Sequence, residues 1–187
     1  MAERFANKVI LISRAARGQG ADEARRFVAE GARVVLGDVL VEESEALAAE
    51  LGAHASSIAL DVTSPETWDH AVRTATERIG GLDVLVNNAG IVLGTPIIGG
   101  DVDDYLRVIM VNQVGVYLGM RAAAPAMIER GGGSIVNISS ISAGEGHRGP
   151  VQTSYPRWRR GRERRKPDLR ARRRGCISHK TDRHPQP

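Results

Sequence analysis

A glycine-bearing turn near the N-terminus has residue types that can bind phosphate. The segment reads Ser13-Arg14-Ala15-Ala16-Arg17-Gly18-Gln19-Gly20 and follows a short apolar run. Glycines in a strand-to-helix turn let backbone N–H groups and the helix N-terminus approach a pyrophosphate. Glycines also occur in turns that merely begin or end a helix, so the turn alone leaves both interpretations open.

An aspartate about 20 residues farther along strengthens the nucleotide interpretation. Asp38 ends the segment Arg33–Asp38, which is expected to be the second strand. A carboxylate at this position can accept hydrogen bonds from the ribose 2′- and 3′-hydroxyls, and it repels a 2′-phosphate. The turn and Asp38 together favour NAD over NADP, although an aspartate at a strand end is also a common turn residue.

The elements that must position these residues alternate between strand and helix patterns. The strands are expected at 9–12, 33–38, 57–61, 82–86 and 134–139, and the helices at 21–28, 42–51, about 63–80 and 102–129. Thr63 is expected to be the N-cap of the third helix, with Pro65 near its first position. Five strands separated by four helices require parallel crossovers, so we predict an α/β fold with a doubly wound, Rossmann-like parallel sheet, truncated after about five strands.

Composition narrows the class of protein further. The chain has 187 residues, of which 42% are apolar and 4% aromatic, as expected for one domain packed mainly by small side chains. No apolar run reaches the roughly 20 residues of a membrane span, and residues 1–8 resemble no secretory signal. The single cysteine, Cys176, excludes an internal disulfide and multi-cysteine metal sites. The prediction is a cytoplasmic protein.

Charge is distributed unevenly along the chain. Residues 1–155 contain 13 basic and 19 acidic side chains, whereas residues 156–187 contain 13 basic and three acidic ones. The second segment has no apolar periodicity, so it cannot bury enough apolar surface to offset its ordering entropy. We therefore predict an incomplete NAD-binding domain at 1–155 and an Arg-rich, disordered tail at 156–187.

Several further segments resemble the short-chain dehydrogenase/reductase family. The turn is similar to the family pattern Thr-Gly-x-x-x-Gly-x-Gly, and four other segments follow in family order and spacing over residues 8–155. They are Leu60-Asp61-Val62, Asn87-Asn88-Ala89-Gly90, Val111-Asn112-Gln113-Val114-Gly115 and Ile138-Ser139-Ser140. Segments 16–20, 37–38 and 81–84 look most like the 3α/20β-hydroxysteroid dehydrogenase branch.

This resemblance implies a role for each matching residue. NAD is the implied cofactor. Its pyrophosphate would lie against Gly18, Gln19 and Gly20, with Arg17 beside them and Ser13 in place of the pattern's threonine. Asp38 would bind the adenosine ribose, Asp61 and Val62 the adenine, and Asn88, Ala89 and Gly90 the ribose and the central sheet. The implied catalytic residues are Asn112, Ser140 (with Ser139 as second candidate) and Tyr155.

The implied reaction is hydride transfer between NAD(H) and a secondary alcohol or ketone, with a hydroxysteroid among the candidates. Tyr155 would be the general acid/base, because the substrate oxygen must gain or lose a proton. A free phenol has a pKa near 10, and the family supplies a lysine four residues later to lower it. Here that position is Arg159, in a segment that begins with Pro156, and Arg14 replaces the first glycine of the turn pattern. Activity of this chain is therefore left open.

The sequence after Tyr155 has no counterpart of the family's last strands, substrate loop or main oligomerisation helix. A small-molecule substrate and no membrane partner are expected. The family typically forms homo-oligomers, but the helix that forms their main interface would be missing here. The abrupt change to Arg-rich sequence suggests the hypothesis of a reading-frame change.

An alternative function is a non-catalytic Rossmann-like remnant whose basic tail binds nucleic acid. Only Trp158 is available there for base stacking, so an accidental solvated tail is favoured over this alternative. A metal site is rejected because the histidines that could form it lack ligand spacing; they are His147, His179 and His184.

Overall fold

The computed structural model describes residues 3–94, 96 and 98–140. Several sequence predictions lie outside these residues and stay predictions. They concern Tyr155, Pro156, Trp158, Arg159, Cys176, the histidines at 147, 179 and 184, and the Arg-rich tail at 156–187.

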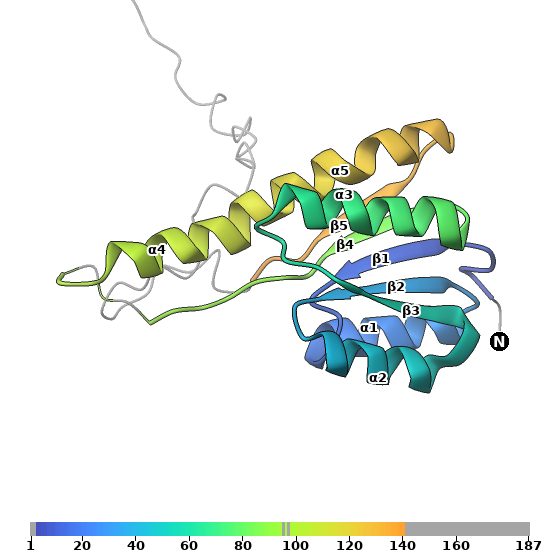
Figure 1. Ribbon diagram of the computed structural model, residues 1–187, viewed down its shortest axis with the longest axis horizontal. Helices are drawn as coiled ribbons and strands as arrows, with labels where there is room; N and C mark the ends of the chain where they lie inside the picture. Colours follow the sequence, from blue (N-terminus) through green and yellow to red (C-terminus); the bar gives the residue numbers. More distant parts are fainter. Residues whose placement is uncertain (1–2, 95, 97, 141–187) are drawn as a thin grey trace, which may run out of the picture.

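A five-stranded parallel sheet forms the centre of the molecule (Figure 1). Its strands are β1 (Val9–Ser13), β2 (Arg33–Asp38), β3 (Ala55–Ala59), β4 (Val84–Asn87) and β5 (Ser134–Asn137). Their spatial order is β3-β2-β1-β4-β5, and every neighbouring pair is parallel. The chain winds outward from β1 in one direction and then, through β4, in the other. The predicted doubly wound α/β fold is therefore confirmed.

Helices cover both faces of the sheet (Figure 1). One face carries α1 (Gly18–Ala29) and α2 (Val41–Leu51), and the other carries α3 (Pro65–Thr74) and α5 (Gly115–Glu129). The shorter elements are the 3-10 helix η1 (Gly52–His54), the π-helical segments η2 (Ala75–Ile79) and η3 (Met110–Val114), and α4 (Val102–Ile109). The predicted helix over 102–129 is thus α4 and α5 joined by a π-helical segment. No helix in the described part of the chain is long and apolar enough to cross a membrane.

The beginning of α3 corrects one prediction. Ser64, not Thr63, is the N-cap, and its Oγ accepts a hydrogen bond from the Thr67 backbone N–H at 3.3 Å. Thr63 instead donates its backbone N–H and its hydroxyl to Asp61. Two adjacent hydroxyl residues satisfy the same capping pattern, and the turn formed by Asp61 decides between them.

The third strand also begins earlier than predicted. It spans Ala55–Ala59 rather than 57–61, because its register with β2 pairs Ala55 with Val34 and Ala59 with Asp38. β2 ends at Asp38, so the pairing ends there as well. The neighbouring strand, rather than the apolar pattern of the segment itself, sets this boundary.

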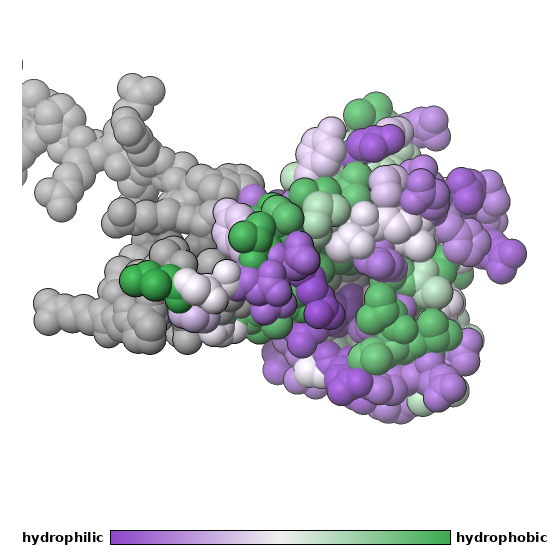
Figure 2. Space-filling view, turned by 60° about the vertical axis from the view of Figure 1, so that its left-hand side comes forward, coloured by the Kyte–Doolittle hydropathy of each residue, from purple (hydrophilic) through white to green (hydrophobic). Residues whose placement is uncertain are grey.

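The core consists of two apolar layers, one on each face of the sheet. Along β1, Val9 and Leu11 pack with Trp68 of α3, whereas Ile10 and Ile12 pack with the α1 and α2 side. Successive side chains of a strand point to opposite faces, so a strand covered on both sides must be apolar throughout. β5 differs, because all of its residues are exposed. On the face shown in Figure 2, apolar surface is interspersed with polar surface.

A buried carboxylate joins the amino end of the sheet to α5. Asp83 precedes β4, and its Oδ2 accepts the Val9 backbone N–H at 2.9 Å. Its Oδ1 accepts hydrogen bonds from Lys8 Nζ and Arg130 Nε, each at 3.0 Å. Burial alone would raise the pKa of Asp83, but the hydrogen bonds from Val9, Arg130 and Lys8 outweigh it and hold this pKa below its ordinary value.

Candidate functional site

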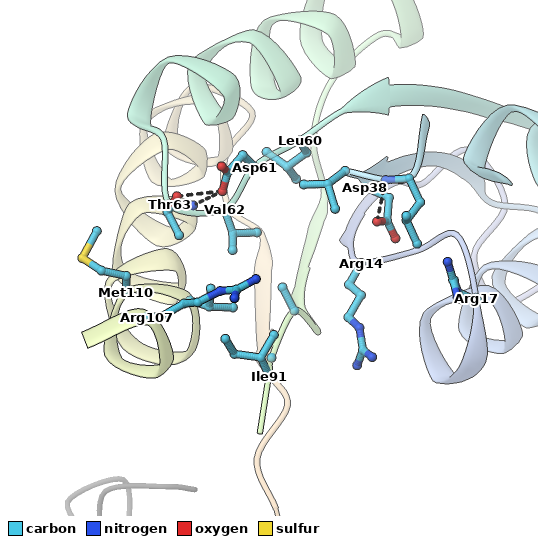
Figure 3. Close-up of a pocket in the computed structure, with 15 residues that line it drawn as sticks. Arg14, Arg17, Asp38, Leu60, Asp61, Val62, Thr63, Ile91, Arg107 and Met110 are labelled. Atoms are coloured by element: carbon cyan, nitrogen blue, oxygen red, sulfur yellow. Dashed lines mark hydrogen bonds between the residues drawn. The ribbon is translucent and has the colours of Figure 1, made fainter. Parts of the chain in front are cut away.

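A cleft of about 590 Å³ opens at the carboxyl ends of the strands. Its walls come from the segments that follow β1, β2, β3 and β4 and from α4 and η3 (Figure 3). Clefts of this size at this edge of a doubly wound sheet are typical of small-molecule sites. Six of the predicted cofactor residues line it: Arg17, Asp38, Asp61, Val62, Ala89 and Gly90.

The turn after β1 has the backbone conformation of a glycine at a position occupied by arginine. Arg14 has φ +55°, in the left-handed region that costs a non-glycine residue about 1–2 kcal/mol. The Asn88 side-chain amide donates to the Arg14 carbonyl at 3.1 Å and to the Ser13 carbonyl at 3.2 Å. The two hydrogen bonds from Asn88 therefore hold the turn in this conformation. Arg14 adopts an unfavourable φ as a result.

Gly20 lets the first turn of α1 pack directly on this backbone. A Cβ at Gly20 would lie 2.3 Å from the Arg14 carbonyl oxygen and 2.8 Å from Asn88 Nδ2. A Cβ added at Gly18 would have no heavy atom within 4 Å. Only the φ of +57°, which favours glycine, therefore restricts the residue type at this position. Gly20 is buried, whereas Gly18 and Gln19 are exposed at the start of the helix.

The N-terminus of α1 is suited to an anion. Arg17 is the N-cap residue, no side chain caps the helix, and no acidic residue lies in its first turn. The first N–H groups of a helix have no partner within the helix and carry the positive end of its dipole. The side chains of Arg14 and Arg17 extend beside this end of the cleft (Figure 3).

Ser13 braces the site without lining the cleft. Its side chain is fully buried, and its Oγ accepts the backbone N–H groups of Asn88 and Ala89, each at 3.0 Å. The same oxygen donates to the Val86 carbonyl at 3.4 Å. Ser13 therefore connects the turn after β1 to the turn after β4, and so holds together two segments that the sequence predicts to bind the cofactor.

Asp38 is held in one position at the end of β2. It is 3% exposed; its Oδ2 accepts the Ala16 backbone N–H at 2.9 Å, and its Oδ1 accepts the Leu40 N–H at 3.1 Å. Each carboxylate oxygen has a second lone pair for a further donor. A rigid carboxylate at the cleft wall can thus accept hydrogen bonds from a diol.

Asp61 and Val62 form the wall that follows β3. Asp61 Oδ1 accepts the Thr63 backbone N–H at 2.9 Å and its hydroxyl at 2.7 Å, which closes a tight turn (Figure 3). The Val62 carbonyl accepts the indole N–H of Trp68 at 3.0 Å. These contacts hold one polar and one apolar side chain at the cleft.

Asn112 fastens the loop after β4 to the helical segment η3. Its side-chain Oδ1 accepts the Ile91 backbone N–H, and its Nδ2 donates to the Ile91 carbonyl, both at 2.8 Å. Asn112 is buried, and Ile91 itself lines the cleft. Ser139 is exposed and Ser140 half-buried; both follow β5 at the same edge of the sheet.

Sequence reasoning missed several residues of the cleft. Arg107 and Met110 reach it from α4 and η3, and the side chain of Arg107 points toward it (Figure 3). No motif includes these residues; the only signal was their spacing with Val111 on one face of the predicted helix. The other lining residues that were not predicted to bind the cofactor are Arg14, Val39, Leu40, Leu60, Thr63, Ile91 and Val111.

Among the described residues, no group of three or more His, Cys, Asp or Glu side chains is placed to hold a metal ion. The basic segment of the alternative function, residues 156–187, lies outside the described part of the chain.

Comparison with protein families gives a match between residues 8–156 and the short chain dehydrogenase model. The chain is 51% identical over 147 residues to a 3-alpha-(or 20-beta)-hydroxysteroid dehydrogenase of Mycobacterium tuberculosis, covering 75% of this chain and 54% of the relative. It is 44% identical over 167 residues to a trans-4-hydroxycyclohexanecarboxylate dehydrogenase of Sinomonas cyclohexanicum, covering 84% and 64%. The chain thus spans about half to two-thirds of the length of these curated relatives.

A solved structure shares the fold. It is a short-chain dehydrogenase/reductase, described as a glucose/ribitol dehydrogenase, from Brucella melitensis. The TM-score is 0.75 at 33% sequence identity, and the match covers 83% of this chain and 65% of the other.

Proposed function

Since the chain belongs to the short-chain dehydrogenase family, we propose that it binds NAD(H) in the cleft at the carboxyl ends of the strands and acts on a secondary alcohol or its ketone. The observation that carries this proposal is the placement of Asp38, a rigid carboxylate, beside the uncapped N-terminus of α1. A diol-binding acid next to an anion-binding helix end fits a ribose attached to a pyrophosphate.

The residues present fit each part of the dinucleotide. The pyrophosphate would lie at Gly18, Gln19 and Gly20, where the first N–H groups of α1 are free of a side-chain cap. The adenosine ribose would lie at Asp38 and the adenine against Asp61 and Val62. Ala89 and Gly90 would contact the second ribose, with Asn88 bracing both turns.

The nicotinamide of NAD(H) supplies the hydride chemistry, and the chain must move the matching proton. Ser140 would donate a hydrogen bond to the substrate oxygen, and Tyr155 would exchange the proton with it. Asn112 would hold a water molecule of the proton relay, and its amide also holds the loop at Ile91 that forms the cleft wall.

The substrate we propose is a secondary alcohol carried on a ring. Two of the relatives are named for such compounds, a hydroxysteroid and a hydroxycyclohexanecarboxylate. We therefore expect NADH formation when the full chain is mixed with NAD and 3α-hydroxysteroids or 4-hydroxycyclohexanecarboxylate, measured by absorbance. Tyr155→Phe should abolish the turnover while leaving NADH binding intact. Tight NADH binding with no turnover of any ring alcohol would contradict the catalytic part of this proposal.

Cofactor preference tests the role of Asp38. NADH should bind at least about tenfold more tightly than NADPH, because a 2′-phosphate beside this carboxylate brings like charges together and loses the ribose hydrogen bonds. Fluorescence titration of the two reduced cofactors gives both dissociation constants.

The matched variants are Asp38→Asn and Asp61→Asn, which remove the same charge from two walls of one cleft. Asp38→Asn should reduce the ratio of the NADPH dissociation constant to the NADH dissociation constant. Asp61→Asn should leave this ratio unchanged. Thermal melts show whether each variant remains folded. Equal affinity of the unmodified chain for NADH and NADPH would rule out this role of Asp38.

Arg14→Gly is expected to tighten NADH binding about fivefold. The Arg14 side chain lines the cleft, and ordering so long a side chain on binding costs about 1–2 kcal/mol. An exposed ion pair with the pyrophosphate returns only about 0–1 kcal/mol. The difference, about 1 kcal/mol, corresponds to the predicted change in Kd.

Arg14→Ala separates the side chain from the backbone strain. Alanine also clears the cleft, so its NADH affinity should match that of Arg14→Gly. Only glycine should raise the melting temperature, because alanine keeps the unfavourable φ of +55°. Identical NADH affinities in the unmodified chain and Arg14→Gly would disprove the prediction.

A further inference from the structure

A second, smaller cavity lies at the opposite edge of the sheet. Its volume is about 160 Å³, and its polar lining comes from Arg33 at the start of β2, His54 at the end of η1, Ser56 near the start of β3, and Arg78 of η2. The dinucleotide cleft lies at the carboxyl ends of the strands, so the two cavities are separated by the length of the sheet.

The charge in this cavity is positive and unbalanced. Two arginines and a histidine line it, and no carboxylate does. Within the described part of the chain, neither Arg33 nor Arg78 has an ion-pair partner, although Arg33 is half-buried. Five other basic residues in the described part are paired with acids, namely Arg4, Lys8, Arg17, Arg25 and Arg130, whereas further arginines such as Arg26 and Arg73 have no ion pair there.

Ser56 adds a buried hydroxyl whose hydrogen-bonding capacity is not used. Its Oγ is buried and has no hydrogen-bond partner among the described residues. The neighbouring Ser57 faces the other side of the sheet and donates to Ser44 Oγ at 2.8 Å. A buried hydroxyl without a partner is unfavourable unless something supplies one, and Ser56 lines this cavity.

We propose that this cavity binds a small tetrahedral oxyanion of the phosphate type. Guanidinium groups donate in planar forks that match phosphate oxygens, and the Ser56 hydroxyl is a further donor. These donors come from three different elements, β2, η2 and β3, which suits a tetrahedral anion better than a planar carboxylate. The cavity is too small for a nucleotide, so the ligand is a free anion or a single phosphate group.

Calorimetric titration of the full chain with inorganic phosphate at constant ionic strength tests this site. Saturable binding is expected, and the double variant Arg33→Gln/Arg78→Gln should weaken it at least tenfold. Arg73→Gln is the matched control, since it removes an exposed arginine of α3 outside the cavity, and it should change the affinity less than twofold. Acetate should bind more weakly than phosphate.

Two further variants show whether phosphate binds in this cavity or at the turn after β1, and whether a loss of binding reflects a loss of folding. Arg17→Gln should retain phosphate binding; loss in Arg17→Gln with retention in the double variant would place the anion at the turn and overturn the proposal. Ser56→Ala removes a hydroxyl that makes no hydrogen bond among the described residues, so it should fold and bind phosphate at least threefold more weakly. Unchanged affinity in Ser56→Ala, or no phosphate binding by the unmodified chain, would also overturn it.

Discussion

Asp83→Ala is expected to lower the free energy of unfolding by about 3 kcal/mol. The Val9 backbone N–H in β1 would lose its acceptor, which alone costs about 1–3 kcal/mol when the donor is buried. Lys8 and Arg130 would also lose charge-assisted hydrogen bonds, but their side chains are 52% and 33% exposed and are still hydrated. The cost therefore lies at the lower end of the range for breaking a buried ion pair. The melting temperature should fall by about 6–12 °C in a thermal melt followed by circular dichroism.

The same carboxylate makes stability depend on acid pH. The pKa of Asp83 is lower in the folded protein than in the unfolded chain, where aspartate titrates near 3.9. Its contribution is therefore complete above the unfolded pKa and is lost as the pH falls through the folded pKa. Stability should decrease below about pH 4.

Asp83→Asn is the control for this pH dependence. The asparagine side chain keeps an acceptor for the Val9 N–H but has no charge to titrate, so the variant should show a smaller decrease below about pH 4. If the melting temperatures of Asp83→Asn and the unmodified chain fall in parallel over this range, Asp83 is not the group responsible.

Gly20→Ala is expected to weaken NADH binding at least about tenfold and to destabilise the fold by about 2–3 kcal/mol. The new Cβ would lie 2.3 Å from the Arg14 carbonyl oxygen and 3.0 Å from Ala15 Cα. Both are backbone atoms and cannot rotate away, so α1 must move relative to the turn. Such a shift misplaces the helix N–H groups that would meet the pyrophosphate. Fluorescence titration and thermal melts measure the two effects.

Gly18→Asn provides the stability control within the same turn. An added Cβ at Gly18 meets no heavy atom within 4 Å, and asparagine tolerates the φ of +57° better than other residues. Its loss of stability should stay below about 1 kcal/mol. Near-native stability and NADH affinity in Gly20→Ala would show that the contact between α1 and the turn is not tight.

The fold could be predicted from the sequence because its pattern is local and repeated. The run Val9–Ile12 is apolar at every position, as a strand covered on both faces must be, and the helices between the runs show helical periodicity. Parallel strands end at one common edge, so the order of segments alone was enough to bring Arg17, Asp38, Asp61 and Ala89 to the same cleft.

Boundaries and individual contacts could not be predicted in the same way. The choice of Ser64 over Thr63 as the helix cap depends on the turn at Asp61, and the start of β3 depends on its pairing with β2. Arg107 joins the cleft only because the segment from α4 to α5 crosses the edge of the sheet (Figure 1). Each of these features depends on neighbours whose positions a single segment does not encode.

The turn after β1 combines features that the sequence alone could predict with features that only the tertiary structure could show. The sequence by itself determined the family resemblance, the strand-to-helix turn and the acid that follows it, because residue type and spacing carry those features. Only the tertiary structure decided that Arg14 takes a left-handed conformation, that Ser13 braces two turns, and that the Asn88 amide donates to the carbonyls of Ser13 and Arg14. The physical reason is distance along the chain: Ser13 and Asn88 are 75 residues apart, and a hydrogen bond between them leaves no periodic signal in the sequence.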